Sequence, residues 1–430
     1  MARLGMALLL VAAVGACDPA KLRHTPDAKP IDGAPDAVPH GMVTVKVYDP
    51  NTPGTIAVGI PVVFVEADGT IVGRPSTDTN GVAMADVHLN ATATAVITTQ
   101  NNVSMSTIAG IQPGDNIVLN SSQPNGQNGM FNVTFPQYPG ATYHYVYGPC
   151  GANSGTGSTT LYMYSYCKQD TMDLVVVAYN SSFVPIAYFE KPGVTYTNGG
   201  STALTGTYSF VSTFNASITN VDPTVQYVYM RRAMPAGNGF SESASGMPMS
   251  GMLPLSMPAI QGATASVETQ ASKGQYANRV IQNIAGSSLT YGVDLGATLL
   301  PWVGPVTLDL DKKMAYVPTD TTGTTHDKPD FFSAEVYYYR DNGAGGQTGY
   351  YWRVIAPQIG DVPLPPLPPE VGDVMPKTTD SVAYTFGKAY ESSTLTWDQA
   401  RVNALDIINT FETSVDTSTR VRESYFQSGD

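Results

Sequence analysis

Apolar and polar residues alternate along most of this chain, and the alternation predicts β-strands. In the stretch MVTVKVYD, which starts at Met42, every second residue is a valine. A period of two places those valines on one face of a strand. The dipeptides Asp68-Gly69 and Asn80-Gly81 interrupt later apolar runs. Glycine supplies the positive φ that a tight hairpin turn requires, so both dipeptides predict hairpins.

The same period continues beyond residue 130. In FNVTFPQYPGATYHYVY, at 131–147, phenylalanine and valine and then tyrosine occupy alternate positions. Short runs separated by Gly, Pro and Asn extend toward the C-terminus, and the 25 tyrosines of the chain favour strands. We therefore predict an all-β fold of tandem β-sandwiches.

One short helix is predicted near the C-terminus. Thr396 and Gln399 have the spacing of a capping box, and apolar residues recur at helical spacing over 397–412. We expect this helix to lie on the last sandwich. The preceding PLPPLPPE, at 363–370, predicts a rigid polyproline strap.

The N-terminus has the layout of a secretory signal. Arg3 is the only charged residue before Cys17, and an apolar run fills the space between them. That run is too short for a permanent membrane span. Its end, Val14-Gly15-Ala16-Cys17, resembles the lipobox of bacterial lipoproteins.

The resemblance implies a signal peptide over 1–16 and acylation, for example with palmitate, of Cys17. The expected partner is then a membrane, held through the lipid anchor, since several acyl chains on one residue make attachment lasting. The protein is expected to be exported and lipid-anchored in the bacterial cell envelope, and the membrane and leaflet stay open. The alternatives are an ordinary signal peptide that contains a cysteine and a buried N-terminal helix.

Residues 17–41 predict a disordered tether. Pro, Asp and Ala dominate this stretch, and large apolar residues are nearly absent. Such a segment buries too little surface to offset its ordering entropy, and proline keeps it extended. The alternative is an arm packed against the folded body.

The next stretch carries a family resemblance. Its pattern resembles bacterial Ig-like and carboxypeptidase-regulatory-like modules, and the matching residues are Gly59, Pro61, Val62, Phe64, Thr77, Asp78, Asn80, Gly81 and Ala83. The resemblance implies an Ig-like β-sandwich over 42–120 and says almost nothing about activity. Residues 131–147 resemble the early strands of a fibronectin type III-like sandwich. The region 130–430 is expected to be one large β-rich unit or two sandwiches, at about 130–230 and 231–430.

Charge excludes one class of partner. Charged residues make up 13% of the chain, against a typical ~25%, and the net charge is −13. Binding to nucleic acid needs Lys and Arg gathered on one face, and no basic cluster is present in the sequence. We therefore expect no nucleic-acid partner.

Beyond Cys17 the chain has two cysteines, Cys150 and Cys167. Two cysteines in an exported chain are expected to form a disulfide. Two buried free thiols are the alternative.

Motifs of catalysis are absent from the sequence. No nucleophile elbow, zinc-protease helix, phosphate-binding loop or calcium loop occurs. Of the five histidines, His40 falls in the expected tether and His88 has no second histidine near it in sequence. We predict no catalytic residues, no metal site and no cofactor. The function is then expected to be structural, adhesive or ligand-binding. The alternative is an envelope hydrolase that acts on glycan or peptide with a carboxylate pair.

Two stretches are expected to be plain loops, and each has metal binding as the alternative. The run GMPMSGMLPLSMP, with Met247, Met249, Met252 and Met257, is expected to cover a sheet as an apolar loop, and the alternative is a Cu(I) site of thioethers. The Asp-rich stretch that follows Asp309 is expected to be a solvated loop, with Ca²⁺ binding as the alternative.

Aromatic residues gather in two neighbouring segments, VYYYR and GYYWR. Neighbours in a strand face opposite ways, so part of each segment belongs to the core. We predict a platform for a surface glycan or protein ligand formed by Tyr337, Tyr339, Tyr350 and Trp352.

Overall fold

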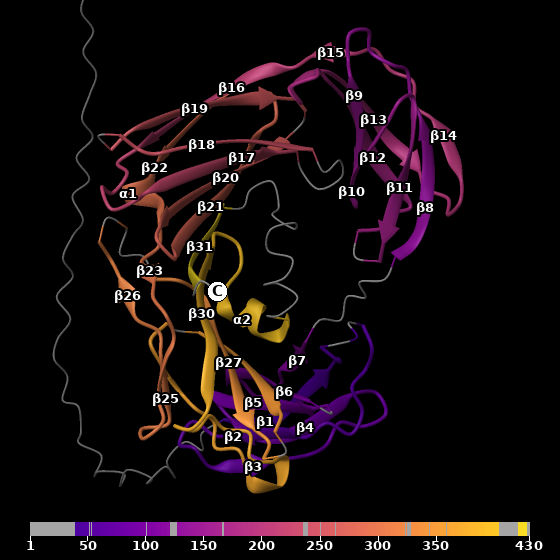
Figure 1. The fold of residues 1–430 in the computed structure, drawn as a ribbon. Coiled ribbons are helices and arrows are strands. Elements are labelled where there is room, and N and C mark those ends of the chain that lie inside the picture. The colour runs from indigo at the N-terminus through magenta and orange to yellow at the C-terminus, as the bar shows by residue number, and fades with distance from the viewer. Residues whose placement is uncertain are drawn as a thin grey trace, which may run out of the picture. The chain divides into compact units, whose positions relative to one another are not determined.

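The computed structural model describes residues 39–427 except 51, 53, 100, 121–126, 166, 235–239, 250, 263, 323, 325–327, 344, 358 and 404–419. The expected signal peptide, the lipidation site Cys17 and the tether up to residue 38 lie outside the described residues. The described chain is built almost entirely of strands, which confirms the predicted all-β fold (Figure 1). No helix among these residues is long and apolar enough to cross a membrane.

A twelve-stranded sheet forms the centre of the fold. All neighbouring strands in it are antiparallel except one parallel pair, β28 with β6. In spatial order the strands are β18 (Ser241–Gly246), β17 (Tyr227–Ala233), β20 (Thr264–Lys273), β21 (Tyr276–Ala285), β31 (Arg420–Gln427), β30 (Ser381–Ser392), β27 (Phe331–Asp341), β28 (Gln347–Ala356), β6 (Asn102–Ile111), β5 (Ala91–Thr98), β2 (Val62–Val65) and β3 (Ile71–Gly73).

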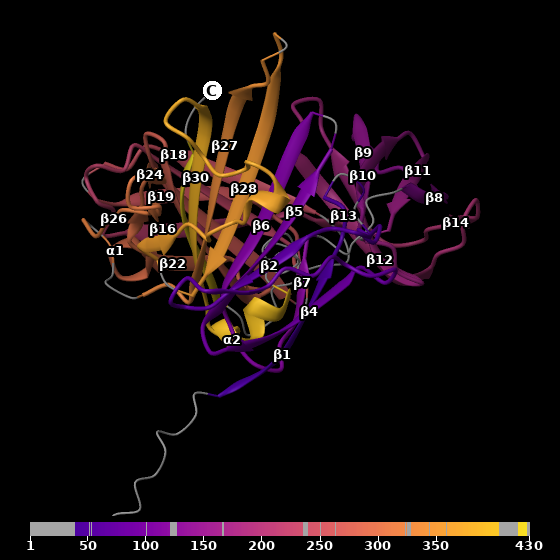
Figure 2. The same ribbon diagram turned by 90° about the horizontal axis from the view of Figure 1, so that it is seen from below.

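One end of this sheet is covered by the first strands of the chain. The cover is the sheet of β4 (Val82–His88), β1 (His40–Val47) and β7 (Asn116–Leu119). Val43 and Phe64 from the two layers are fully buried in a common core. The stretch 42–120, expected to form a sandwich of its own, thus supplies two layers. Its second layer consists of β2, β3, β5 and β6. Because β6 pairs with β28, this layer is part of the same sheet as the C-terminal strands (Figure 2).

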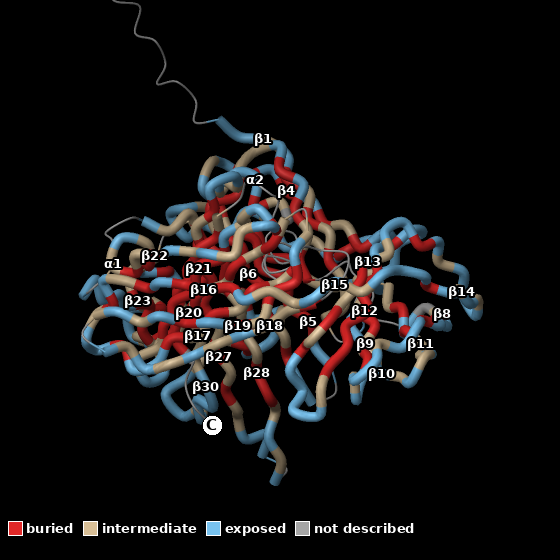
Figure 3. Tube along the Cα trace, turned by 90° about the horizontal axis from the view of Figure 1, so that it is seen from above, coloured by how far each residue is buried: buried red, intermediate tan, exposed pale blue. Residues whose placement is uncertain are grey.

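Two further covers lie on the central sheet. Over β27 and β28, the cover includes the predicted proline strap, and Leu364 of the strap packs in one core with Trp352. Its strands are β24 (Thr307–Asp309), β25 (Met314–Tyr316) and β29 (Asp361–Pro363), followed by η1 (Pro369–Val371). A two-stranded sheet of β23 (Trp302–Val303) and β26 (Thr319–Asp320) lies beside it, and β23 contacts β21, β30 and β31. Over β17, β20 and β21, which carry many buried positions in Figure 3, the cover is β19 (Leu253–Ala259), β16 (Ser212–Thr219), β22 (Thr290–Asp294) and α1 (Leu295–Thr298).

A second sandwich lies between the first strands and β16 in the sequence. Its sheets have a core of their own, with Phe131 and Leu174 among its buried residues. One sheet has β10 (Gly151–Gly155), β9 (Tyr143–Gly148), β12 (Thr171–Tyr179), β13 (Pro185–Thr195) and β15 (Ser209–Phe210), and the other has β11 (Ser158–Tyr164), β8 (Gln127–Thr134) and β14 (Ser201–Ala203). The predicted disulfide between Cys150 and Cys167 is present in it. The expected division at 230–231 falls inside β17, because that strand runs through to Ala233.

The predicted C-terminal helix begins where its capping box indicates. The Oε1 atom of Gln399 accepts the backbone N–H of Thr396 at 3.0 Å. The helix α2 (Trp397–Ala400) then continues as η2 (Arg401–Asn403), and the rest of the predicted 397–412 helix lies outside the described residues. Arg401 links this segment to the residue that directly precedes β7, through a buried bidentate ion pair with Asp115.

Candidate functional site

A groove of about 430 Å³ opens where the parallel strands β28 and β6 meet. It lies on the face of the central sheet that carries Phe331 and Ile355. These two residues are buried in the same core as the cover formed by β1, β4 and β7. Farther along the same face the cover ends and Tyr337 and Tyr351 line the groove. The groove is therefore the part of this face that the N-terminal layer leaves open.

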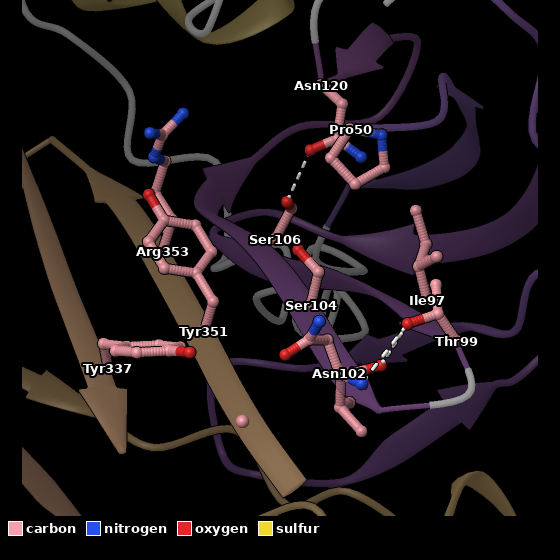
Figure 4. Close-up of a pocket in the computed structure, with 12 residues that line it drawn as sticks. Pro50, Ile97, Thr99, Asn102, Ser104, Ser106, Asn120, Tyr337, Tyr351 and Arg353 are labelled. Carbon is pink, nitrogen blue, oxygen red and sulfur yellow. Dashed lines mark hydrogen bonds between the residues drawn. The ribbon is translucent and has the colours of Figure 1, made fainter. Parts of the chain in front are cut away.

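We call this space the tyrosine groove. Tyr351 and Arg353 on β28 lie across from Ser104 and Ser106 on β6 as direct register partners (Figure 4). The rim on the far side is held by a hydrogen bond of 2.7 Å from Ser106 to the amide oxygen of Asn120. The lining residues are Pro50, Ile97, Thr99, Asn102, Val103, Ser104, Ser106, Asn120, Tyr337, Gly349, Tyr351 and Arg353.

The register of the β27–β28 hairpin decides which aromatic residues face the groove. Tyr337 pairs with Tyr351, so these two share a face. The sequence-based platform combined Tyr337 and Tyr339 with Tyr350 and Trp352, and the structure corrects it. Tyr350 and Trp352 point into the opposite core and are only 8% and 2% exposed.

The physical reason is that both misplaced residues have partners in the core. The Tyr350 ring stacks on Tyr338 with ring centres 4.9 Å apart. The indole N–H of Trp352 donates to the hydroxyl of Thr107 at 2.9 Å. Tyr339 does share the face of Tyr337, and their ring centres are 4.9 Å apart. Of the four predicted platform residues, Tyr337 lines the groove and Tyr339 lies beside it on the same face.

Neighbouring side chains and burial set the charge of the arginine and the tyrosines that line the groove. The Nε atom of Arg353 donates to Glu335 at 2.7 Å, and the guanidinium lies over the ring of Tyr351. Burial raises the pKa of Tyr351 well above its ordinary value. A hydrogen bond with Tyr339 and partial burial raise the pKa of Tyr337 to about 12. Both phenols are thus neutral hydrogen-bonding groups at any physiological pH.

Gly349 makes room for the groove. A side chain at this position would place its Cβ 2.7 Å from the hydroxyl oxygen of Tyr337 and 2.7 Å from Oδ1 of Asn102. Real Cβ atoms do not approach other atoms so closely, so only glycine leaves both side chains where they are. The absence of a side chain here lets Tyr337 and Asn102 reach the same space.

Several groove residues were missed from the sequence. Tyr351 is absent from the predicted platform. Because neighbours in a strand face opposite ways, the burial of Tyr350 on one face places Tyr351 on the other face, with Tyr337. Tyr384 on β30 extends the aromatic row, with its ring centre 5.6 Å from that of Tyr337. Asn102 and Asn120 gave no signal, because isolated asparagines are equally common in turns.

The methionine-rich and Asp-rich stretches, both expected to be loops, contain strands: β19 lies in the first, and β25 and β26 lie in the second. Met247 and Met249 are 75% and 80% exposed and form the tip between β18 and β19, so this part of the run does not cover a sheet as predicted. The end of the run lies in β19, where Met257 is buried in a core. In the acidic stretch, Asp309 pairs with Lys312 at 3.0 Å. A carboxylate already neutralised by lysine is a poor calcium ligand. Among the described residues, no group of three or more His, Cys, Asp or Glu is placed to hold a metal ion.

Comparisons with known proteins assign no family. No family of known proteins matches the chain, and no curated protein matches it. The Bacillus anthracis TIE protein is similar over 59% of this chain, at 11% identity and a TM-score of 0.15, and the chain spans about half (49%) of that protein. A streptococcal ancillary pilin is similar over 60% of this chain and 98% of its own, at 8% identity and a TM-score of 0.15.

The pilus adhesin SpaC from Lactobacillus rhamnosus GG is similar over 74% of this chain and 44% of its own. Its identity is 9% and its TM-score is 0.15. Scores this low carry no argument about the function of this chain, which must come from its own residues.

Proposed function

We propose that this protein is an exported bacterial lipoprotein, anchored to the cell envelope through Cys17, that binds a hydroxyl-rich ligand such as a glycan in the tyrosine groove. Residues 17–38 act as a tether that holds the folded body away from the membrane. The role is binding or adhesion rather than catalysis.

The observation that supports binding is the composition of the groove. Its volume of about 430 Å³ falls in the range of small-ligand sites, roughly 300–1,000 Å³. The flat rings of Tyr337 and Tyr351 offer apolar surface, and their hydroxyls stay neutral. Asn102, Ser104 and Arg353 add polar groups that donate and accept hydrogen bonds. Flat apolar faces edged by hydroxyls are what a sugar ring presents, so the two surfaces complement one another.

The composition of the groove also argues against the hydrolase alternative. Such an enzyme needs two carboxyl groups flanking the bond to be broken. The described residues that line the groove include neither Asp nor Glu. The carboxylate beside the lining, Glu335, accepts a hydrogen bond from Arg353. No observation among the described residues favours catalysis in this groove.

The binding proposal is tested with a printed glycan array. We expect the full chain to bind a subset of glycans and Tyr337→Ala to lose most of that signal, because a ring that lines the groove is removed. Tyr162→Ala is the matched control, since Tyr162 is 45% exposed on β11 and does not line the groove. Absence of binding to any glycan, or equal loss in both variants, contradicts the proposal.

The anchor is tested separately by intact mass and detergent-phase partitioning of the natively expressed protein. We expect residues 1–16 to be missing and acyl mass to be present on Cys17. Cys17→Ser is expected to move the protein into the aqueous phase. A Cys17→Ser protein that still partitions with detergent contradicts the anchor and leaves the groove proposal standing.

A further inference from the structure

Two histidines that are far apart in the sequence meet across the first pair of strands. His40 begins β1 and His88 ends β4, and the two residues are direct register partners. Their ring centres are 5.6 Å apart. The sequence had assigned His40 to the tether and had found no second histidine near His88. The structure places His40 in β1 instead of the tether, and the antiparallel pairing of β1 with β4 brings it beside His88 although the two are far apart in the sequence.

Each imidazole is oriented by a carboxylate. The Nδ1 atom of His40 lies 3.0 Å from both oxygens of Asp86, and the Nδ1 atom of His88 lies 3.1 Å from Oε1 of Glu66. Glu66 is itself fixed, because it also accepts the backbone N–H of His88. A carboxylate at Nδ1 favours the tautomer with the proton there, which leaves the lone pair of Nε2 available to bind a metal.

The separation of the two rings suits a shared ion. With a bond of 2.0–2.1 Å from metal to Nε2, each ring centre lies about 3.2 Å from the ion. Two such rings in a tetrahedral arrangement have centres about 5.2 Å apart, close to the observed 5.6 Å. The side chains of His40 and His88 are 60% and 50% exposed, so an ion can reach them without rearrangement of the fold.

We propose that His40 and His88 form a binding site for a divalent transition metal ion of the Zn²⁺, Ni²⁺ or Cu²⁺ class. Imidazole suits these ions, whereas Ca²⁺ and Mg²⁺ prefer oxygen ligands. Asp86 and Glu66 orient the rings and place negative charge beside the cation. Water fills the other coordination positions. A bound ion cross-links β1 to β4, because the two histidines lie on these two strands.

The test is titration of the full chain, purified without a polyhistidine tag, with ZnCl₂ at pH 7.5 by calorimetry. We expect one ion per chain. His40→Gln and His88→Gln are each expected to weaken binding at least tenfold, and the double variant to abolish it. Tyr162→Ala, at an exposed position on β11, is the control and keeps the wild-type affinity. Glu66→Gln, which changes an orienting residue only, is expected to weaken binding several-fold.

Two controls separate the metal site from folding. Both histidines are exposed, so the variants are expected to keep the wild-type Tm in the presence of EDTA. Wild-type binding should weaken as the pH is lowered, because protons compete with the metal for the imidazole nitrogens. Absence of binding at 1 mM ZnCl₂, or binding that survives the double variant, overturns the proposal. Neither result bears on the tyrosine groove.

Discussion

At the scale of single residues, a buried carboxyl group introduces a dependence of stability on pH. Glu242 on β18 accepts a hydrogen bond from Tyr179 of the second sandwich, and burial raises the pKa of Glu242 to about 7. The hydroxyls of Tyr179 and Tyr147 are 2.6 Å apart, which completes a small polar cluster. Burial disfavours the charged form of Glu242 and no cation in the cluster offsets it.

The sign of the effect follows from the direction of this shift. A carboxyl group whose pKa is higher in the folded than in the unfolded protein stabilises the fold fully below about pH 4.5, its ordinary value. This stabilisation is lost as the pH rises to about 7.

Glu242→Gln stays neutral at every pH and therefore avoids this loss. Relative to the wild type, the free energy of unfolding of the variant should increase by about 1–2 kcal/mol between pH 4 and pH 8, allowing for partial solvent exposure. Urea unfolding of both proteins at pH 4, 6 and 8 measures the difference. A difference that does not change with pH contradicts the assignment.

At the scale of elements, strands β21, β31 and β30 are joined by a buried charge cluster. The carboxylate of Glu423 on β31 is fully buried and pairs with Arg279 on β21. It also lies 3.1 Å from Nζ of Lys388 on β30. By contrast, the pair of Arg74 with Glu370 at 2.8 Å has both side chains more than half exposed.

Glu423→Gln is expected to lower the free energy of unfolding by about 3–5 kcal/mol, because Lys388 loses its buried carboxylate partner and Arg279 is left with Glu268. Glu370→Gln is the matched control and should cost about 1 kcal/mol or less, since exposed pairs contribute little. Denaturant unfolding compares the two. Similar costs for both variants would show that the buried cluster does not stabilise the sheet.

The disulfide is a second link between elements. Cys150 and Cys167 are 17 residues apart and their Cα atoms are 5.3 Å apart. Replacing both with serine should lower the free energy of unfolding by about 3 kcal/mol in the chain-entropy model. Denaturant unfolding measures the loss, and thiol titration of unreduced, denatured Cys17→Ser protein should find no free thiol. Detection of two thiols per chain contradicts the bond.

How far the sequence predicts these elements depends on the distance between partners. Alternating valines and tyrosines predicted the strands, because every second residue of a strand faces the same way and this pattern can be read within a few consecutive residues. The face of Tyr351 depended on the hairpin register, which a loop with several glycines leaves open. The pairing of β6 with β28, and of His40 with His88, joins segments far apart in the sequence. No local pattern specifies such contacts, so the groove and the histidine pair became visible only in the structure.

At the scale of the whole molecule, strand β31 joins the two halves of the central sheet. β31 pairs with β21 on one side and with β30 on the other. It therefore connects the half of the sheet built from β17, β18, β20 and β21 to the half that carries the tyrosine groove.

Deletion of 420–430 removes β31 and leaves two unpaired edges in the middle of the sheet. Unpaired edges promote aggregation, so we expect the truncated chain to be insoluble or to lack a cooperative thermal transition. Deletion of 428–430 alone keeps the whole strand and serves as the control. Soluble yield and circular dichroism melting measure both. A truncated chain that melts like the wild type contradicts the joining role of β31.

The central claim, that the tyrosine groove binds the ligand, is tested most directly by Gly349→Ala. The added methyl group changes no charge and intrudes on the hydroxyl of Tyr337 and the amide of Asn102. Calorimetry should use the glycan that gives the strongest array signal. The account predicts at least a tenfold loss of affinity with a Tm close to that of the wild type. Unchanged affinity in a variant that folds normally would contradict the groove as the binding site.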